Sequence, residues 1–133
     1  MMEVIVDASV LIAVVTNEQE KEKLVEMTRE AELIAPLSVH WEVGNAFSSL
    51  LKRKRMTLRE ALRAIDSYLQ IPVRFVEVEL AESLELSNEL GLYAYDAYLL
   101  CSAMKYRLPL ITLDGRLIQA ARHKKIQVLE VAE

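Results

Sequence analysis

The chain has 133 residues, which suits one domain with one core, and 53% of them are hydrophobic. Its formal net charge of −4 argues against a protein that coats nucleic acid non-specifically. The single cysteine, Cys101, cannot form an internal disulfide and fits a reducing cytoplasm. The first residues include Glu3 and Asp7 and lack the basic segment of a signal peptide, and the apolar run at 10–15 is shorter than the ~20 residues of a membrane span. We expect one domain spanning residues 1–133, located in the cytoplasm and not in a membrane.

Apolar, β-branched runs alternate with amphipathic stretches along the whole chain. In chain order, this pattern predicts a strand at 4–6, helices at 9–15 and 18–29, a strand at 33–35, helices at 38–55 and 57–68, a strand at 73–76, helices at 80–90 and 95–106, a strand at 110–112, a helix from 114 or 115 to 124, and a strand at 128–129. Five strands that alternate with helices indicate an α/β fold, in which helices cover both faces of a parallel sheet.

Helix-capping residues support several of these boundaries. Ser9 and Ser38 are predicted to cap the helices that they begin. Thr57 followed three residues later by Glu60 has the pattern of a capping box. Gly91 is typical of the residue that ends a helix.

Four acidic residues occupy positions where a parallel α/β sheet brings carboxylates together. Asp7 follows the first strand, Asp114 follows the fourth, Glu42 lies in the helix at 38–55, and Asp96 lies near the start of the helix at 95–106. Ligands of an open parallel sheet bind beyond the carboxyl ends of its strands. Clustered carboxylates repel one another unless a cation neutralises them, and carboxylates with water suit Mg²⁺ or Mn²⁺. The sequence therefore predicts a divalent-metal site for phosphate chemistry, with either one metal or two metals ~3.5–4 Å apart.

Each acidic residue also has a simpler structural explanation. Asp7 and Asp96 could cap the helices that follow them, Asp114 could form a turn with Gly115, and Glu42 could be a solvated helix residue. Together these explanations are weaker, because Asp96 lies among alanine and tyrosine residues and Glu42 has no basic residue within one turn. A carboxylate among apolar neighbours needs a partner or a metal.

Four short motifs around these acids resemble the motifs of PIN-domain nucleases. They are the segment 7–11 that begins with Asp7, the segment 38–46 with Glu42 at its centre, the segment 92–97 with Asp96, and the segment 110–114 that ends in Thr112-Leu113-Asp114. The four motifs occur in order over nearly the whole chain. The compact size also resembles the VapC toxins of toxin–antitoxin pairs.

The resemblance implies a three-layer α/β/α fold with a five-stranded parallel sheet of order 3-2-1-4-5. It implies a ribonuclease that needs Mg²⁺ or Mn²⁺, and it makes Asp7, Glu42, Asp96 and Asp114 the catalytic and metal-binding acids. Ser9 and Thr112 match small hydroxyl positions that support this site. The resemblance further implies a homodimer that acts on RNA and that a cognate antitoxin protein binds.

Two basic groups are candidates for contacts with RNA. The strongest charge run is Lys52, Arg53, Lys54 and Arg55, which either tracks an RNA backbone or solvates a helix end. Arg116 belongs to a second basic group that follows Asp114.

Aromatic residues and the histidines have simpler roles in this interpretation. Tyrosines 93, 95 and 98 flank Asp96 and could stack on bases, but we expect them to pack in the core. We expect His40 to pack or to form a surface hydrogen bond, and not to act as a nucleophile.

Two other families place acids at strand ends, and the sequence argues against both. A receiver domain needs a phosphoacceptor aspartate after its middle strand, where this chain has Glu77, and a haloacid-type phosphatase needs a second aspartate where this chain has Ser9. A catalytically silent PIN-like binding module is the remaining alternative, and the intact acidic set argues against it. The sequence does not indicate which RNA is cut.

Overall fold

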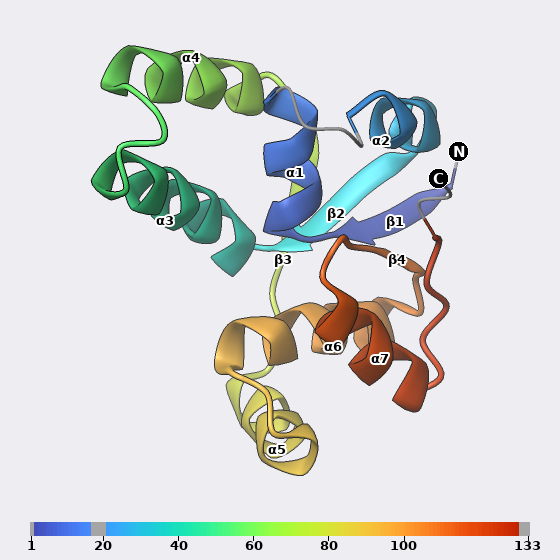
Figure 1. The fold of residues 1–133 in the computed structure, drawn as a ribbon. Coiled ribbons are helices and arrows are strands. Elements are labelled where there is room, and N and C mark those ends of the chain that lie inside the picture. Colours follow the sequence, from blue (N-terminus) through green and yellow to red (C-terminus); the bar gives the residue numbers. More distant parts are fainter. Residues whose placement is uncertain (1, 17–20, 131–133) are drawn as a thin grey trace.

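The computed structural model describes residues 2–16 and 21–130, and its centre is a parallel sheet (Figure 1). The strands are β1 (Glu3–Val6), β2 (Glu32–Pro36), β3 (Val73–Val76) and β4 (Leu110–Ile111), in the spatial order β3-β2-β1-β4. The inner strands β1 and β2 are continuous apolar runs because helices cover both of their faces. The expected α/β fold with a parallel sheet is confirmed.

A fifth strand is not confirmed in the described part of the chain. At the expected position, Val128 forms a single parallel bridge with Leu110. The backbone N–H of Leu110 donates to Gln127 O and that of Leu129 donates to Leu110 O, each at 2.9 Å. This segment therefore runs beside β4, in the place that the order 3-2-1-4-5 gives to the fifth strand. Because β4 itself has only two residues, it offers no longer ladder to pair with.

Helices lie on both sides of the sheet (Figure 1). One side carries α1 (Ala8–Val15), α2 (Lys21–Thr28), α3 (Ser38–Lys52) and α4 (Leu58–Leu69), and the other carries α5 (Leu80–Leu90), α6 (Ala94–Tyr106) and α7 (Gly115–His123). Their apolar faces and the strands form one continuous core, with Ile5, Ile34 and Leu100 among its fully buried side chains. None of the described helices is long and apolar enough to cross a bilayer.

Two of the predicted helix caps are wrong. Helix α1 is capped by Asp7, whose carboxylate accepts from the backbone N–H of Val10, so Ser9 lies inside the helix. Helix α3 begins after Leu37 without a side-chain cap, and Ser38 is its first residue. The capping box of Thr57 and Glu60 and the left-handed Gly91 at the end of α5 are confirmed. The predicted start of the helix at 18–29 falls partly outside the described residues.

Candidate active site

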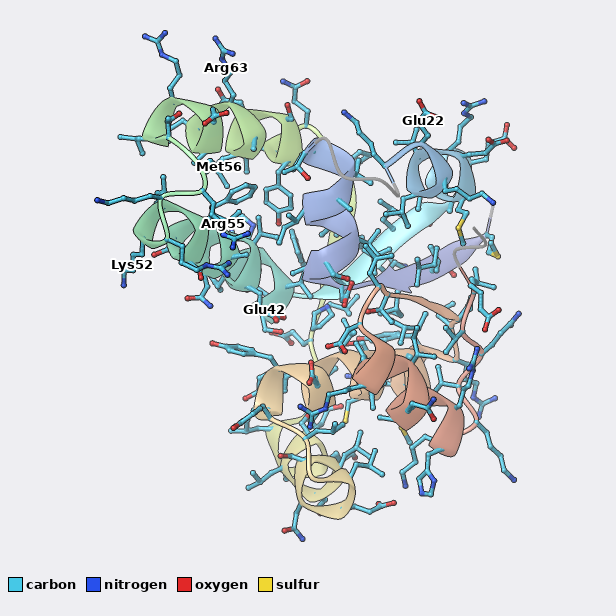
Figure 2. The ribbon with its side chains drawn as sticks, viewed as in Figure 1. Glu22, Glu42, Lys52, Arg55, Met56 and Arg63 are labelled. Atoms are coloured by element: carbon cyan, nitrogen blue, oxygen red, sulfur yellow. The ribbon has the colours of Figure 1, made fainter. Side chains whose placement is uncertain are left out.

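The four predicted acids lie at the carboxyl edge of the sheet. Asp7 follows β1, Asp114 lies three residues after the end of β4, Glu42 is in the second turn of α3, and Asp96 is in the first turn of α6. Figure 2 shows Glu42 near the end of α3 that adjoins the sheet, with Lys52 at the far end of the same helix. Asp7 is buried, Glu42 and Asp96 are partly buried, and Asp114 is exposed.

Asp7 is fixed by three hydrogen-bond donors. Its Oδ1 accepts from Ser9 Oγ at 2.6 Å and from the backbone N–H of Val10 at 3.2 Å, and its Oδ2 accepts from Thr112 Oγ1 at 2.5 Å. A buried carboxylate needs such partners because its charge has lost its hydration. Asp7 is therefore both the cap of α1 and a carboxylate held in one orientation at the sheet edge.

The two hydroxyls that hold Asp7 also join the loops after β1 and β4. Ser9 Oγ accepts from the backbone N–H of Leu113 at 3.1 Å, and Thr112 Oγ1 accepts from that of Asp114 at 3.0 Å. Each hydroxyl therefore donates its proton to Asp7 and accepts from a backbone N–H of the loop after β4. This arrangement fixes the position of Asp114 relative to Asp7.

Asp114 caps α7, which is a role that the sequence analysis had considered for Asp7 and Asp96 and not for Asp114. Its Oδ1 accepts from the backbone N–H groups of Arg116 at 2.9 Å and Leu117 at 3.4 Å. Its Oδ2 accepts no hydrogen bond from the described residues and stays available to a ligand. Asp96, by contrast, does not cap α6, because the capping residue is Tyr93.

The carboxylates influence one another electrostatically. Burial raises the pKa of Asp7, its three hydrogen bonds oppose that rise, and the charge of Asp114 adds to it. Burial, followed by the charges of Asp7 and Asp96, raises the pKa of Glu42 to about 7. Burial and Asp114 raise the pKa of Asp96, while Arg116 lowers it. The fold therefore brings each of the four acids within electrostatic reach of two others.

The donor chemistry of this site fits a hard divalent cation. In the described ranges, no group of three or more metal-binding side chains is already close enough to hold an ion. Carboxylate oxygens are the donors that Mg²⁺ or Mn²⁺ prefers, and in three of the four acids, Asp7, Glu42 and Asp96, burial and neighbouring negative charge raise the pKa.

The metal-free protein should lose stability as the pH rises toward neutrality. Glu42 has a pKa of about 7 in the folded state against an ordinary 4.5, so the folded protein binds this proton more tightly than the unfolded chain. The contribution of this proton to the free energy of unfolding is therefore full below about pH 4.5, and it is lost as the pH rises through about 7. Melting temperatures measured in EDTA should fall by a few degrees over this interval, and Glu42→Gln should reduce that fall. The matched variant Glu85→Gln, at an exposed site on α5, should keep it. Parallel curves for Glu42→Gln and the wild type would contradict the assignment.

The predicted RNA-binding residues are exposed but lie at different distances from the acids. The run of Lys52, Arg53, Lys54 and Arg55 covers the end of α3 and the turn that follows, about 15 Å from Glu42 at 1.5 Å per helical residue. Arg116 is in the first turn of α7, and its charge lowers the pKa of Asp96. Arg116 therefore lies beside Asp7, Glu42, Asp96 and Asp114 at the carboxyl edge of the sheet, which we call the acidic edge. The run at 52–55 forms a separate surface.

Several expectations about neighbouring side chains need correction. Tyr93 and Tyr95 are exposed, so the expectation that they pack in the core is wrong, while Tyr98 is partly buried. His40 packs as expected, and its Nδ1 lies 2.9 Å from the hydroxyl of Tyr68.

Trp41 was missed by the sequence analysis, although a signal was present. The buried positions of α3 are Val39, Val43 and Phe47, with a spacing of four residues. This spacing places Trp41 on the outer side of the helix, where it is 66% exposed. An exposed tryptophan next to a candidate catalytic glutamate is typical of a surface that contacts a ligand.

A profile of the PIN domain matches residues 4–123. The chain belongs to the PIN domain family. Comparison with curated proteins found no match. The matched residues include all four acids, and the α/β fold with its parallel sheet is the one expected from the motifs.

Solved structures of similar fold support this membership. PAE2754 from Pyrobaculum aerophilum has 27% identity and a TM-score of 0.71, with 90% of this chain and 79% of that chain covered. VapC20 from Mycobacterium tuberculosis, described as a toxin that cleaves the sarcin–ricin loop, has 17% identity and a TM-score of 0.65 over 88% of this chain and 94% of that one. VapBC2 from Rickettsia felis, bound to a DNA fragment from its promoter, has 14% identity and a TM-score of 0.64 over 96% and 98%. At such low identity, the last two likenesses establish the fold alone.

Proposed function

We propose that this PIN domain is a metal-dependent endoribonuclease and the toxin of a toxin–antitoxin pair. The observation that supports this most directly is Asp7, a buried carboxylate that three donors hold beside Glu42, Asp96 and Asp114. A stability role alone explains Asp7 as a cap but not the convergence of three further carboxylates on one sheet edge. Membership of the PIN domain family supports nuclease chemistry.

In this proposal the four carboxylates hold Mg²⁺ or Mn²⁺, and the two hydroxyls keep Asp7 in position. The bound ion would lower the pKa of water and neutralise charge on the phosphate of the scissile bond. Ser9 and Thr112 would prevent rotation of the Asp7 carboxylate, since each of its oxygens already accepts a hydroxyl hydrogen bond. Glu42, with its raised pKa, would release its proton as the cation binds.

Metal dependence tests the proposal. The purified protein should cleave single-stranded RNA with Mg²⁺ or Mn²⁺, and excess EDTA should abolish the cleavage. The ion should also raise the melting temperature, because binding to the folded state alone stabilises it by about 2.7 kcal/mol at a hundredfold excess over Kd. A protein that shows neither cleavage nor metal-dependent stabilisation would instead be the silent PIN-like binding module.

We also propose a cytoplasmic homodimer that binds a cognate antitoxin protein. The support is the fold shared with the toxin–antitoxin structures from Rickettsia felis and from Klebsiella pneumoniae. A basic antitoxin side chain that reached the carboxylates would inhibit by replacing the cation electrostatically. Light scattering of the isolated protein at micromolar concentration should give the mass of two chains, and a strict monomer would contradict the dimer.

A further inference from the structure

Exposed aromatic rings gather on the segments that carry the acids. The chain has one tryptophan, five tyrosines and two phenylalanines. Trp41, Tyr93 and Tyr95 are 66%, 85% and 53% exposed. Large exposed rings forgo the free energy that burial would give, about 25 cal/mol per Å² of apolar surface. Several such rings on the segments that carry the four acids indicate a surface that binds a ligand.

Two of these rings belong to residues that precede Glu42 and Asp96 in the sequence, on two helices that are in contact. Trp41 precedes Glu42 on α3, and Tyr95 precedes Asp96 on α6. Helices α3 and α6 are in contact, and the charge of Asp96 raises the pKa of Glu42. Adjacent Cα atoms are 3.8 Å apart, so each ring begins within one residue of its carboxylate. Trp41 and Tyr95 are therefore exposed residues on the two contacting helices that carry Glu42 and Asp96.

Trp41 and Tyr95 each pack against a second ring. His40 meets Trp41 in a T-shaped contact at 4.7 Å, and His40 Nδ1 is itself fixed by the Tyr68 hydroxyl at 2.9 Å. Tyr98 meets Tyr95 in a T-shaped contact at 6.1 Å. Such a contact occupies at most one face of a ring. Each exposed ring is thus oriented in advance and keeps a face for stacking.

A hollow of about 400 Å³ lies farther along the same edge. It lies at the carboxyl ends of β2 and β3, and it is lined by Pro36, Leu37, Ser38, Val76, Val78, Tyr98 and the two glutamates Glu77 and Glu79. In the sheet order β3-β2-β1-β4, this hollow is followed by Asp7 after β1 and Asp114 after β4. The wall residue Ser38 has a buried hydroxyl without a hydrogen-bond partner in the described part of the chain. With two glutamates in its lining, this hollow does not favour an RNA strand, so the exposed rings are the surface beside the acids that fits a base.

We propose that Trp41 and Tyr95 stack against unpaired bases of the RNA substrate. The proposal rests on the ribonuclease function and adds residues that would position the substrate without taking part in the chemistry. Stacking on an aromatic face is tolerant of base identity and is available only to bases that are not paired in a duplex. A protein partner is the competing occupant, but open ring faces beside a phosphate-directed acidic edge favour bases.

The only tryptophan of the chain makes this proposal directly measurable, because Trp41 fluorescence reports on its own stacking. The titrant is a short mixed-sequence single-stranded RNA, with Ca²⁺ replacing the catalytic ion so that the RNA is not cut. The RNA should quench Trp41, and an abasic strand of the same length or a duplex of the same sequence should quench it far less. Trp41→Ala and Tyr95→Ala, measured by filter binding, should each weaken affinity for the single strand by about 5- to 150-fold. Trp41→Phe and Tyr95→Phe should recover most of that loss.

Leu69→Ala is the matched control, because Leu69 is 62% exposed on α4 and lies outside the acidic edge. It should bind RNA as the wild type does. Equal affinity of wild type and both alanine variants, in a protein that binds and cleaves RNA, would overturn the stacking role and leave the ribonuclease function intact. A wild type that neither binds nor cleaves RNA would overturn both. Unchanged RNA affinity together with a lower mass of Trp41→Ala in light scattering would assign the rings to a contact between protein chains.

Discussion

Asp7→Asn is expected to reduce RNA cleavage by at least about a hundredfold while the protein stays folded. The carboxylate at this position is buried and oriented by Ser9, Val10 and Thr112. Asparagine keeps the shape but removes the negative charge that a divalent cation requires. Loss of one preorganised electrostatic group at an active site commonly costs about 10²–10³ in rate. Cleavage of a labelled single-stranded RNA with saturating Mn²⁺ measures this loss.

The melting temperature of Asp7→Asn shows whether this variant stays folded. The asparagine amide retains one acceptor oxygen, and the hydroxyls of Ser9 and Thr112 can rotate to accept from its NH₂ group. The pKa of Asp7 is raised in the fold, so loss of its charge also removes a cost of burial and repulsion. We therefore expect the melting temperature in EDTA to be unchanged or higher. Asp66→Asn, at an exposed position of α4, is the control and should cleave normally. Full activity of Asp7→Asn would sink the assignment of the site.

Thr112 separates the positioning role from the metal-binding role. Thr112→Ser keeps the hydroxyl that donates to Asp7 and accepts from the backbone of Asp114, whereas Thr112→Val keeps the shape and loses both bonds. If the hydroxyl positions Asp7 for a cation, valine should raise the Mn²⁺ concentration needed for half-maximal cleavage, and serine should not. A role in packing alone would leave that concentration the same in both variants.

The strand ends made most of this site predictable from sequence. Asp7 and Asp114 directly follow apolar strands, and the rule that parallel strands end at one edge brings them together without any structure. Glu42 and Asp96 come from helices, and only the family motifs placed them at the same edge. The hydroxyl network was predictable in part, because Ser9 and Thr112 were identified, but the hydrogen bonds of Thr112 to Asp7 and of Ser9 to the backbone of Leu113 depend on tertiary contacts.

The errors have physical causes that the sequence does not reveal. Ser9 was predicted as a cap because serine is common there, yet Asp7 lies one residue before the helix and its carboxylate reaches Val10 N–H. Tyr93 and Tyr95 were expected in the core because they are aromatic and lie in an apolar stretch. Their exposure follows from the buried side of α6, which is set by Ala97, Leu100 and Ala103. The fifth strand reduces to one bridge because its neighbour β4 is too short, a property of the pair that neither segment shows alone.

Neutralising the basic run is expected to weaken RNA binding for all sequences alike. The run comprises Lys52, Arg53, Lys54 and Arg55, all exposed, and none of them forms an ion pair with another described residue. Unpaired basic side chains are free to meet phosphates, and each contact releases counterions. The slope of log affinity against log salt should fall by about 0.7 for each lost contact on single-stranded RNA, or about 2.8 if all four contact phosphates. Cleavage at saturating RNA should survive, because Lys52 lies at the far end of α3 from Glu42 (Figure 2).

A salt titration by filter binding, with Ca²⁺ in place of the catalytic ion, compares the wild type with a variant carrying glutamine at all four positions. Glutamine keeps a long polar stem, and at Lys54, where φ is 55°, it carries the same left-handed backbone cost as lysine. The control replaces Lys21, Lys23 and Arg29 of the α2 region with glutamine, which changes net charge on a surface away from the acidic edge. If only net charge mattered, both variants would lose affinity in proportion to the charges removed. A specific phosphate track predicts a reduced slope in the fourfold variant alone. Identical slopes for the wild type and the fourfold variant would reject the track, and would assign substrate capture to Arg116, whose charge already acts on Asp96 at the acidic edge.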